Sequence, residues 1–270
     1  MLDFVVDRDR CIRDGLCIAT CSRGVLRDDG DGCPEVANEN VCNACGHCSA
    51  VCPVGAVTSP KCGGEAAGPL QPGLDVSPEA GVQFLLSCRS IRQYKQDSVN
   101  RNEIEALLDA ARRAPSAGNG QPVRWLAVSG RDKMEKITAL TMNWYDTVAR
   151  ANPTLAGGYN VDGMMARYKT GYDPIMRSAP NAVFAITDPT ARRGPIDSAI
   201  ALTYFCLAAH AMHIGSCWCG MGMNAVSHVP LREFLGLGEN DAVQGIVFFG
   251  YPDIDFPAMP PRKPLRAQWL

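Results

Sequence analysis

Apolar residues recur with helical spacing after residue 77 of this 270-residue chain. Ser77, Pro78 and Glu79 have the composition of a helix start, with serine as N-cap and proline at the first helical position. A second helix is predicted from Asn100, because Glu103 follows three residues later as in a capping box. One face of this helix collects Ile104, Leu107, Leu108 and Ala111.

Three short apolar runs bounded by turn residues predict strands at residues 124–129, 182–187 and 243–249. Between the last two lies a mostly apolar segment at residues 196–214, which Gly215 ends. Charged and histidine side chains interrupt it, so we expect a buried core helix and no membrane span. Helices and strands alternate irregularly, which predicts an α+β domain over residues 77–270.

The first sixty residues have a different texture. Nine of the 13 cysteines lie within residues 1–62, and apolar periodicity is weak there. Two cysteine runs about thirty residues apart, each followed by a short apolar stretch, indicate a duplicated half. We expect a small cysteine-rich domain over residues 1–60, a Gly- and Pro-rich linker over residues 61–76, and a larger domain after it.

Charge and composition exclude some classes of protein. The formal net charge is -2 and aromatic residues make up 7%, so we expect no nucleic-acid partner, which would favour a basic surface. The charged N-terminus lacks the apolar run of a signal peptide. We expect a cytoplasmic protein, where clustered thiols serve metals or catalysis more often than disulfides.

Residues 42–53 read CNACGHCSAVCP, a complete CxxCxxCxxxCP run. This is the bacterial ferredoxin spacing, in which three close thiolates hold one cluster and the fourth reaches another. A zinc site is the alternative, but zinc knuckles use paired CxxC elements separated by a long gap. We therefore expect iron–sulfur chemistry.

The first run, CIRDGLCIATCS at residues 11–22, is imperfect. Asp14 stands where a cysteine is expected, and Ser22 replaces the usual proline. The whole segment still resembles two-cluster ferredoxins, which implies a ferredoxin-like α+β iron–sulfur domain over residues 1–60. The crossed pattern of that family implies one cluster on Cys11, Asp14, Cys17 and Cys52, and a second on Cys42, Cys45, Cys48 and Cys21.

Asp14 leaves several alternatives open. It can ligate iron in a 4Fe–4S cluster, leave an empty corner in a 3Fe–4S cluster, or mark a cluster that is absent. As a harder ligand than thiolate, a carboxylate should hold that iron less tightly. Asp14 can also be a plain surface-loop residue. Cys33 and Cys62 lie outside both runs, and we interpret them as non-ligands.

Two segments of the larger domain suggest phosphate and ring binding. Residues 88–94 read CRSIRQY, and two arginines beside a serine can make forked contacts to a phosphate. Residues 115–122, PSAGNGQP, are small enough for backbone to approach a planar ligand. With GSCWCG at 215–220 and the closing GYP…PPRKP at 250–264, these segments follow the order seen in the nitroreductase family of FMN enzymes, which this domain resembles.

The resemblance implies roles for matching positions. Arg89, Ser90, Arg92 and Arg262 would hold the FMN phosphate and ribityl chain. Asn119 would bond the flavin, with Ser116 and Gln121 nearby, and Cys217, Trp218, Cys219 and Gly220 would run beside the ring. A backbone N–H near Cys219 or Gly220 would face flavin N5. The resemblance also implies a homodimer with FMN at its interface. Cys217 and Cys219 are expected to pack, although a redox pair is the alternative.

Together the segments predict an FMN-dependent oxidoreductase that receives electrons through its own clusters and reduces a nitro compound, quinone or activated alkene. The donor would be a one-electron carrier such as ferredoxin, or NAD(P)H. In a rival hypothesis FMN oxidises NAD(P)H and passes electrons outward. In a third the protein only transfers or senses electrons. An aromatic insertion at residues 141–177 would either cover the flavin or fill the core.

Overall fold

The computed structural model of the chain describes residues 4–59 and 70–270. They form two compact units: the first takes in residues up to Asp75 together with Ser116–Gly120, and the second takes in Val76–Pro115 and Gln121–Leu270. The expected linker residues 61–69, Cys62 among them, lie outside the described residues.

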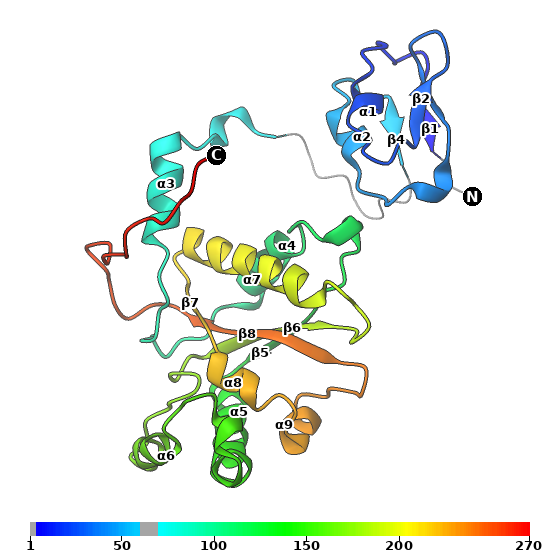
Figure 1. Cartoon of the computed structure of the whole chain (residues 1–270). Helices are drawn as coiled ribbons and strands as arrows, with labels where there is room; N and C mark the ends of the chain where they lie inside the picture. The colour runs from blue at the N-terminus through cyan, green and yellow to red at the C-terminus, as the bar shows by residue number, and fades with distance from the viewer. Residues whose placement is uncertain (1–3, 60–69) are drawn as a thin grey trace. The chain divides into compact units, whose positions relative to one another are not determined.

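The first unit is built from two small antiparallel pairs of strands and two short helices (Figure 1). Strand β1 (Val5–Val6) pairs with β4 (Val57–Thr58), which joins the two ends of the cysteine-rich segment. Strands β2 (Leu26–Asp28) and β3 (Pro34–Val36) form a hairpin. Helices α1 (Leu16–Ala19) and α2 (His47–Val51) each follow one group of cysteines, and η1 (Glu39–Val41) precedes the second group.

The backbone of the first unit repeats itself with an offset of 31 residues. Left-handed glycines precede both helices, with φ of 70° at Gly15 and 74° at Gly46. A second glycine pair follows the helices, with φ of 61° at Gly24 and 62° at Gly55. Both pairs have the sequence offset of the two cysteine runs, so the duplication expected from the sequence is visible in the fold.

The second unit is centred on a four-stranded antiparallel sheet of order β5-β6-β8-β7. Its strands are β5 (Arg124–Ser129), β6 (Asn181–Thr187), β8 (Ala242–Gly250) and β7 (Gly215–Trp218). Every pairing is antiparallel, which confirms the α+β class expected for this part. The three predicted strands are β5, β6 and β8, whereas the four-residue edge strand β7 was not predicted.

Helices cover both faces of this sheet (Figure 1). One face carries α4 (Arg101–Ala111) and α7 (Gly194–Ala211), and the other carries α5 (Arg131–Trp144) with α8 (Gly220–Asn224) and α9 (Val229–Phe234). Helix α3 (Pro78–Ser87) lies beyond α7, and α6 (Val161–Lys169) lies beside α5. The remaining helical turns are η3 (Pro72–Leu74), η4 (Ala117–Asn119), η5 (Tyr145–Ala149) and η6 (Pro153–Ala156).

Strand β6 shows why the sheet separates two cores. All seven of its residues are buried, because successive side chains point to opposite faces and both faces are covered. Phe184 and Ile186 join the core with α5, whereas Val183 and Ala185 join the core with α4 and α7. Such double coverage explains why the strand is a continuous apolar run with no alternation.

Both predicted helix starts are confirmed. The Ser77 hydroxyl accepts from the Ala80 N–H at 3.2 Å, and the Asn100 side chain accepts from the Glu103 N–H at 3.0 Å. The predicted core helix at 196–214 is wrong at its C-terminal end. The helix ends at Ala211, and His213 adopts a left-handed φ of 56° so that the chain can turn into β7.

Candidate functional site

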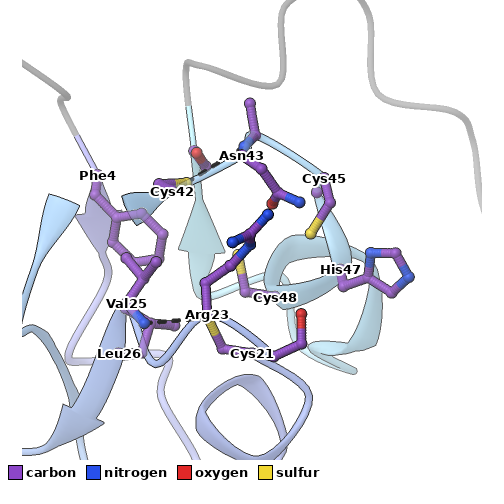
Figure 2. A pocket seen from close by; sticks show the side chains of 14 residues that line it. Phe4, Cys21, Arg23, Val25, Leu26, Cys42, Asn43, Cys45, His47 and Cys48 are labelled. Atoms are coloured by element: carbon purple, nitrogen blue, oxygen red, sulfur yellow. Dashed lines mark hydrogen bonds between the residues drawn. The ribbon is translucent and has the colours of Figure 1, made fainter. Parts of the chain in front are cut away.

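Four predicted ligand cysteines of the first unit line one pocket. These are Cys21, Cys42, Cys45 and Cys48, the set expected for the second cluster. Figure 2 shows their sulfur atoms facing the middle of the pocket, with Phe4 and Val25 forming an apolar wall. The chain therefore gathers three neighbouring thiols and one from the other cysteine run.

Backbone N–H groups point at several of these sulfurs. Val25 N–H donates to Cys21 Sγ at 3.3 Å, and Ala44 N–H donates to Cys42 Sγ at 3.4 Å (Figure 2). Burial raises the pKa of Cys21, but N–H donors, Val25 first, outweigh it and hold that pKa below its usual value. The donors thus favour the charged form of the Cys21 sulfur, the form that binds metal.

The other predicted ligand set is less completely defined. Cys17 is buried, and burial raises its pKa, with the nearby charges of Asp14 and Cys11 adding to the effect. Asp14 itself is exposed and accepts from the Leu16 N–H at 3.2 Å, as a turn residue does. Cys52 Sγ accepts from the Ala56 N–H at 3.2 Å, which repeats the bond from Val25 to Cys21.

Within residues 4–59 and 70–270, no group of three or more His, Cys, Asp or Glu side chains is placed to hold a single metal ion. Cys33, expected to be a non-ligand, is buried at 2% exposure. Its thiol is hydrogen-bonded to the thiol of Cys11, and both cysteines are free of disulfides. His47 lines the pocket of the four cysteines.

Two of the predicted flavin segments of the second unit, residues 89–92 and 215–220, meet at the edge strand β7. Ser90 forms a parallel bridge with Ser216, and the Ile91 N–H donates to Ser216 O at 3.0 Å. This brings residues 89–92 beside the strand that carries Cys217 and Trp218. Gly215 permits the approach, because a Cβ there would meet the Ile91 side chain at 2.8 Å.

Arg89 has the most informative environment of this group. Its Nη2 donates to Leu86 O at 2.8 Å, while its Nε is buried and has no hydrogen-bond partner in the described part of the chain. A buried guanidinium N–H without an acceptor is costly, so this position fits an anionic ligand. Arg92, Gln121 and Arg262 are exposed.

The segment after β7 contains the two backbone N–H groups, of Cys219 and Gly220, that were expected to face flavin N5. The Cys219 N–H donates to Ile246 O at 2.8 Å and so is engaged in the sheet, whereas Gly220 begins helix α8. Cys217 and Cys219 are both buried and free. Burial raises the pKa of Cys219 to about 12, which keeps it a neutral thiol.

The segment predicted to contact the flavin ring at Ser116 and Asn119 belongs to the first compact unit. There the Asn119 amide donates to the backbone oxygens of Asn43 at 3.2 Å and Ala44 at 2.9 Å. Asn119 has a left-handed φ of 57°, a conformation that asparagine tolerates better than most residues.

No helix in the described ranges is both long and apolar enough to cross a membrane. The apolar helix α7 is instead buried along Ser198, Leu202, Phe205 and Ala209, as expected for a core helix.

Comparisons with known proteins agree with this geometry. A family model described as "Nitroreductase family" matches residues 85–251, more than half of the chain. An NADH dehydrogenase of Thermus thermophilus is 29% identical over 178 residues, which cover 62% of this chain and 84% of that protein.

Two solved structures share the fold, each at a TM-score of 0.55. A nitroreductase with bound FMN from Bacteroides fragilis is 23% identical over 69% of this chain and 94% of that chain. A nitroreductase with bound FMN from Desulfitobacterium hafniense is 22% identical over 69% of this chain and 97% of that chain. The chain therefore belongs to the nitroreductase family and is an FMN-dependent oxidoreductase.

Proposed function

We propose that this oxidoreductase receives electrons through iron–sulfur clusters in its own first unit and reduces a small organic acceptor, such as a nitro compound, quinone or activated alkene. The observation that carries the proposal is the pocket lined by Cys21, Cys42, Cys45 and Cys48. It lies in the same chain as a flavin fold, and linking two redox centres in one chain raises their effective concentration.

The cysteine pocket suits a cluster better than a single ion. Each thiolate of a cubane binds a different iron corner, so its ligands stand farther apart than the ligands of one zinc ion. Four cysteines that line one pocket, three of them from a single CxxCxxC loop, support the proposal of a cluster. We propose Cys11, Cys17 and Cys52, with Asp14 or an empty corner, for the other cluster.

The second unit supplies a fitting site for FMN. We propose that Arg89 binds the phosphate through its unpartnered Nε, with Ser90, Arg92 and Arg262 beside it. Cys217, Trp218 and Gly220 would flank the ring, and the Gly220 N–H is the donor left for flavin N5 because that of Cys219 is engaged. Gln121 completes the proposed set in this unit, and the flavin contacts implied for Ser116 and Asn119 stay predictions, since both residues belong to the first unit. FMN would supply both one- and two-electron chemistry.

We further propose that the second unit is a homodimer. Apolar side chains stay exposed together on α3, with Val82 at 56%, Leu85 at 57% and Leu86 at 50%. Grouped exposed apolar side chains of this kind mark interaction surfaces. Sedimentation velocity should give twice the mass of the chain, and Leu85→Glu should shift it toward the monomer.

A first experiment is to count iron, sulfide and FMN per chain in anaerobically purified protein. We expect about eight iron atoms and one FMN, or about seven iron atoms if the corner at Asp14 is empty. Cys45→Ser should reduce the iron count, whereas Cys33→Ala, also in the first unit but outside both ligand sets, should retain it. FMN without iron, or with zinc, would contradict the iron–sulfur part of the proposal.

The relative from Thermus, an NADH dehydrogenase, favours a second candidate in which NAD(P)H reduces the flavin and electrons leave through the clusters. Turnover with NADH and with reduced ferredoxin distinguishes the two directions. The first proposal expects Cys45→Ser to abolish reduction of a nitro compound by ferredoxin. In the second, NADH oxidation with a nitro acceptor persists in that variant, and only reduction of an external carrier protein is lost.

A further inference from the structure

A pocket of about 340 Å³ in the second unit is not explained by the flavin residues named above. It lies in the aromatic insertion between β5 and β6, on the side of the sheet that carries α5 and α8. Its lining includes Tyr159, Asn160 and Met164 from the start of α6, Arg167 from the middle of that helix, Arg177 from the following loop, and Met221 from α8.

The pocket borders the segment proposed to flank the flavin. Met221 directly follows Gly220, and its backbone oxygen accepts from the Tyr145 hydroxyl at 3.1 Å. The Tyr159 hydroxyl lies 3.5 Å from the position that a Cβ on Gly220 would take. The loop before Arg177 is in contact too, since Cys219 Sγ donates to Ile175 O at 3.6 Å. A molecule in this pocket is therefore next to Gly220.

The charged side chains that line the pocket are all positive. Arg167 and Arg177 line it, and no aspartate or glutamate does. Among the described residues neither arginine forms an ion pair with a carboxylate. Both guanidinium groups lie near the Tyr172 ring, at 4.0 Å and 5.3 Å from its centroid, and Arg177 also donates to the Tyr172 hydroxyl. Two cations are thus held together by an aromatic ring, and in the described chain neither is ion-paired with a carboxylate.

The backbone at Arg177 is strained, which points to function. Arg177 and Ser178 have φ of 58° and 56°, a left-handed pair that non-glycine residues rarely adopt. The Asp173 carboxylate holds the loop by accepting from the N–H groups of Ile175, Met176 and Ser178, each at 2.9 Å. Strain that persists because the surroundings enforce it is characteristic of functional sites.

We propose that this pocket binds the carboxylate of a small aromatic acceptor through Arg167 and Arg177. Planar guanidinium groups match carboxylate geometry, and Tyr159, Met164 and Met221 offer apolar surface to a ring. At about 340 Å³ the volume is at the small end of ligand pockets, which suits one substituted ring better than a dinucleotide. The proposal rests on the proposed function, whose acceptor it narrows to anionic aromatic compounds.

Equilibrium binding tests the proposal without turnover. Oxidised, FMN-loaded protein is titrated by calorimetry with 4-nitrobenzoate and with the neutral 4-nitrobenzamide, with no reductant present. We expect the carboxylate to bind about tenfold more tightly or better, as charge-assisted bonds allow. Arg167→Gln/Arg177→Asn should remove this preference, since asparagine tolerates the left-handed backbone at position 177. Lys169→Gln, which removes a charge from the same helix outside the pocket, should retain it.

Other outcomes would overturn the proposal. If the native protein binds the two compounds equally well, the pocket has no preference for the carboxylate. If Lys169→Gln loses the preference to the same extent as the double variant, the preference comes from the overall charge of the protein. If the double variant loses FMN, the arginines bind the flavin phosphate. If it keeps its affinity for 4-nitrobenzoate but loses binding of 2′-AMP, titrated in the same way, the arginines bind a nucleotide. The proposed function fails separately if the preference is present in a protein that reduces neither compound.

Discussion

At the scale of single residues, Asp173 accepts several hydrogen bonds that no motif in the sequence predicts. Besides the three N–H groups of its loop, its carboxylate accepts from the Thr138 hydroxyl of α5 at 3.1 Å. Four donors on one half-buried carboxylate fix both the loop and its position on the helix. The geometry around Arg177 thus depends on Asp173, which does not itself line the pocket of Arg167 and Arg177.

We predict that Asp173→Ala lowers the free energy of unfolding of the second unit by roughly 2–4 kcal/mol, because several donors lose a charged acceptor. Urea unfolding followed by tryptophan fluorescence measures this, since all four tryptophans lie in that unit. The control is Asp162→Ala, whose exposed ion pair with Arg150 should contribute less than about 1 kcal/mol. Equal effects of the two changes would contradict the role given to Asp173.

Cys219 gives a second prediction at this scale. Its side chain is 1% exposed, and burial raises its pKa to about 12. Near neutral pH the sulfur is therefore neither accessible to a reagent nor ionised to the reactive thiolate. N-ethylmaleimide at pH 8 should leave Cys219 unlabelled in the folded protein and label it after denaturation, as mapped by peptide mass spectrometry. Rapid labelling in the native state would revive the alternative of a redox pair with Cys217.

At the scale of elements, helix α3 depends on one histidine of α7. His210 Nε2 lies 2.9 Å from the Ser87 hydroxyl, and the His210 and Phe84 rings are 4.9 Å apart between centroids. No side chain of α3 is fully buried in the described chain, so these contacts are a large share of what holds the helix. Burial, with the charge of His213 adding, lowers the pKa of His210.

This lowered pKa predicts how α3 responds to pH. The undocked helix leaves His210 with its ordinary pKa of about 6.5, so undocking takes up protons as the pH falls through that value. Docking should therefore be strongest above about pH 6.5 and weaken below it. Hydrogen exchange of α3 amides at pH 7.5 and 5.5, corrected for intrinsic rates, measures the change. His210→Gln should show no such dependence, and an unchanged dependence would exclude His210 as its source.

At the scale of the whole molecule, the two units differ in how much apolar core they have. Among the described residues, the hydrophobic core of the first unit has four buried members, Cys17, Val25, Leu26 and Val57, whereas the second unit has two extensive cores on either side of its sheet. A core as small as the first is rarely stable without a metal or disulfides. We therefore expect the first unit to depend on the proposed clusters for folding and the second to be independent of them.

Removal of iron by a chelator under mildly oxidising conditions tests this difference. We predict that amides of the first unit lose protection from hydrogen exchange, because metal binding and folding are coupled there. The urea midpoint from tryptophan fluorescence should stay the same, because that signal comes from the second unit. Unchanged protection in the iron-free first unit would show that its backbone folds without clusters.

The sequence predicted the elements whose residues follow a period or carry a cap. Strand β5 matches its predicted bounds, and Asn100 caps α4 as its spacing with Glu103 indicated. Strand β7 was missed because four residues are too few for a period, and it exists through pairing with β8. The helix end was misplaced because a left-handed His213 leaves no signal in apolar spacing.

The candidate sites divide in the same way. Spacing along one loop predicted that Cys42, Cys45 and Cys48 lie together. Cys21, which the ferredoxin resemblance assigned to the same set, lines the same pocket from 21 residues earlier. Arg167 and Arg177 were not predicted, since surface arginines are common and only the Asp173 loop sets their geometry. The sequence signal that could have indicated them is the aromatic insertion at residues 141–177, which was left open between a flavin cover and filler.

Strand order also has a consequence for the newly synthesised chain. Strand β8 lies between β6 and β7, so the sheet of the second unit cannot be completed until Gly250 has emerged from the ribosome. The pairing of β1 with β4, in contrast, needs only the chain up to Thr58. Because domains fold as they are translated, the thiols of the first unit can come together while most of the flavin domain is still being made.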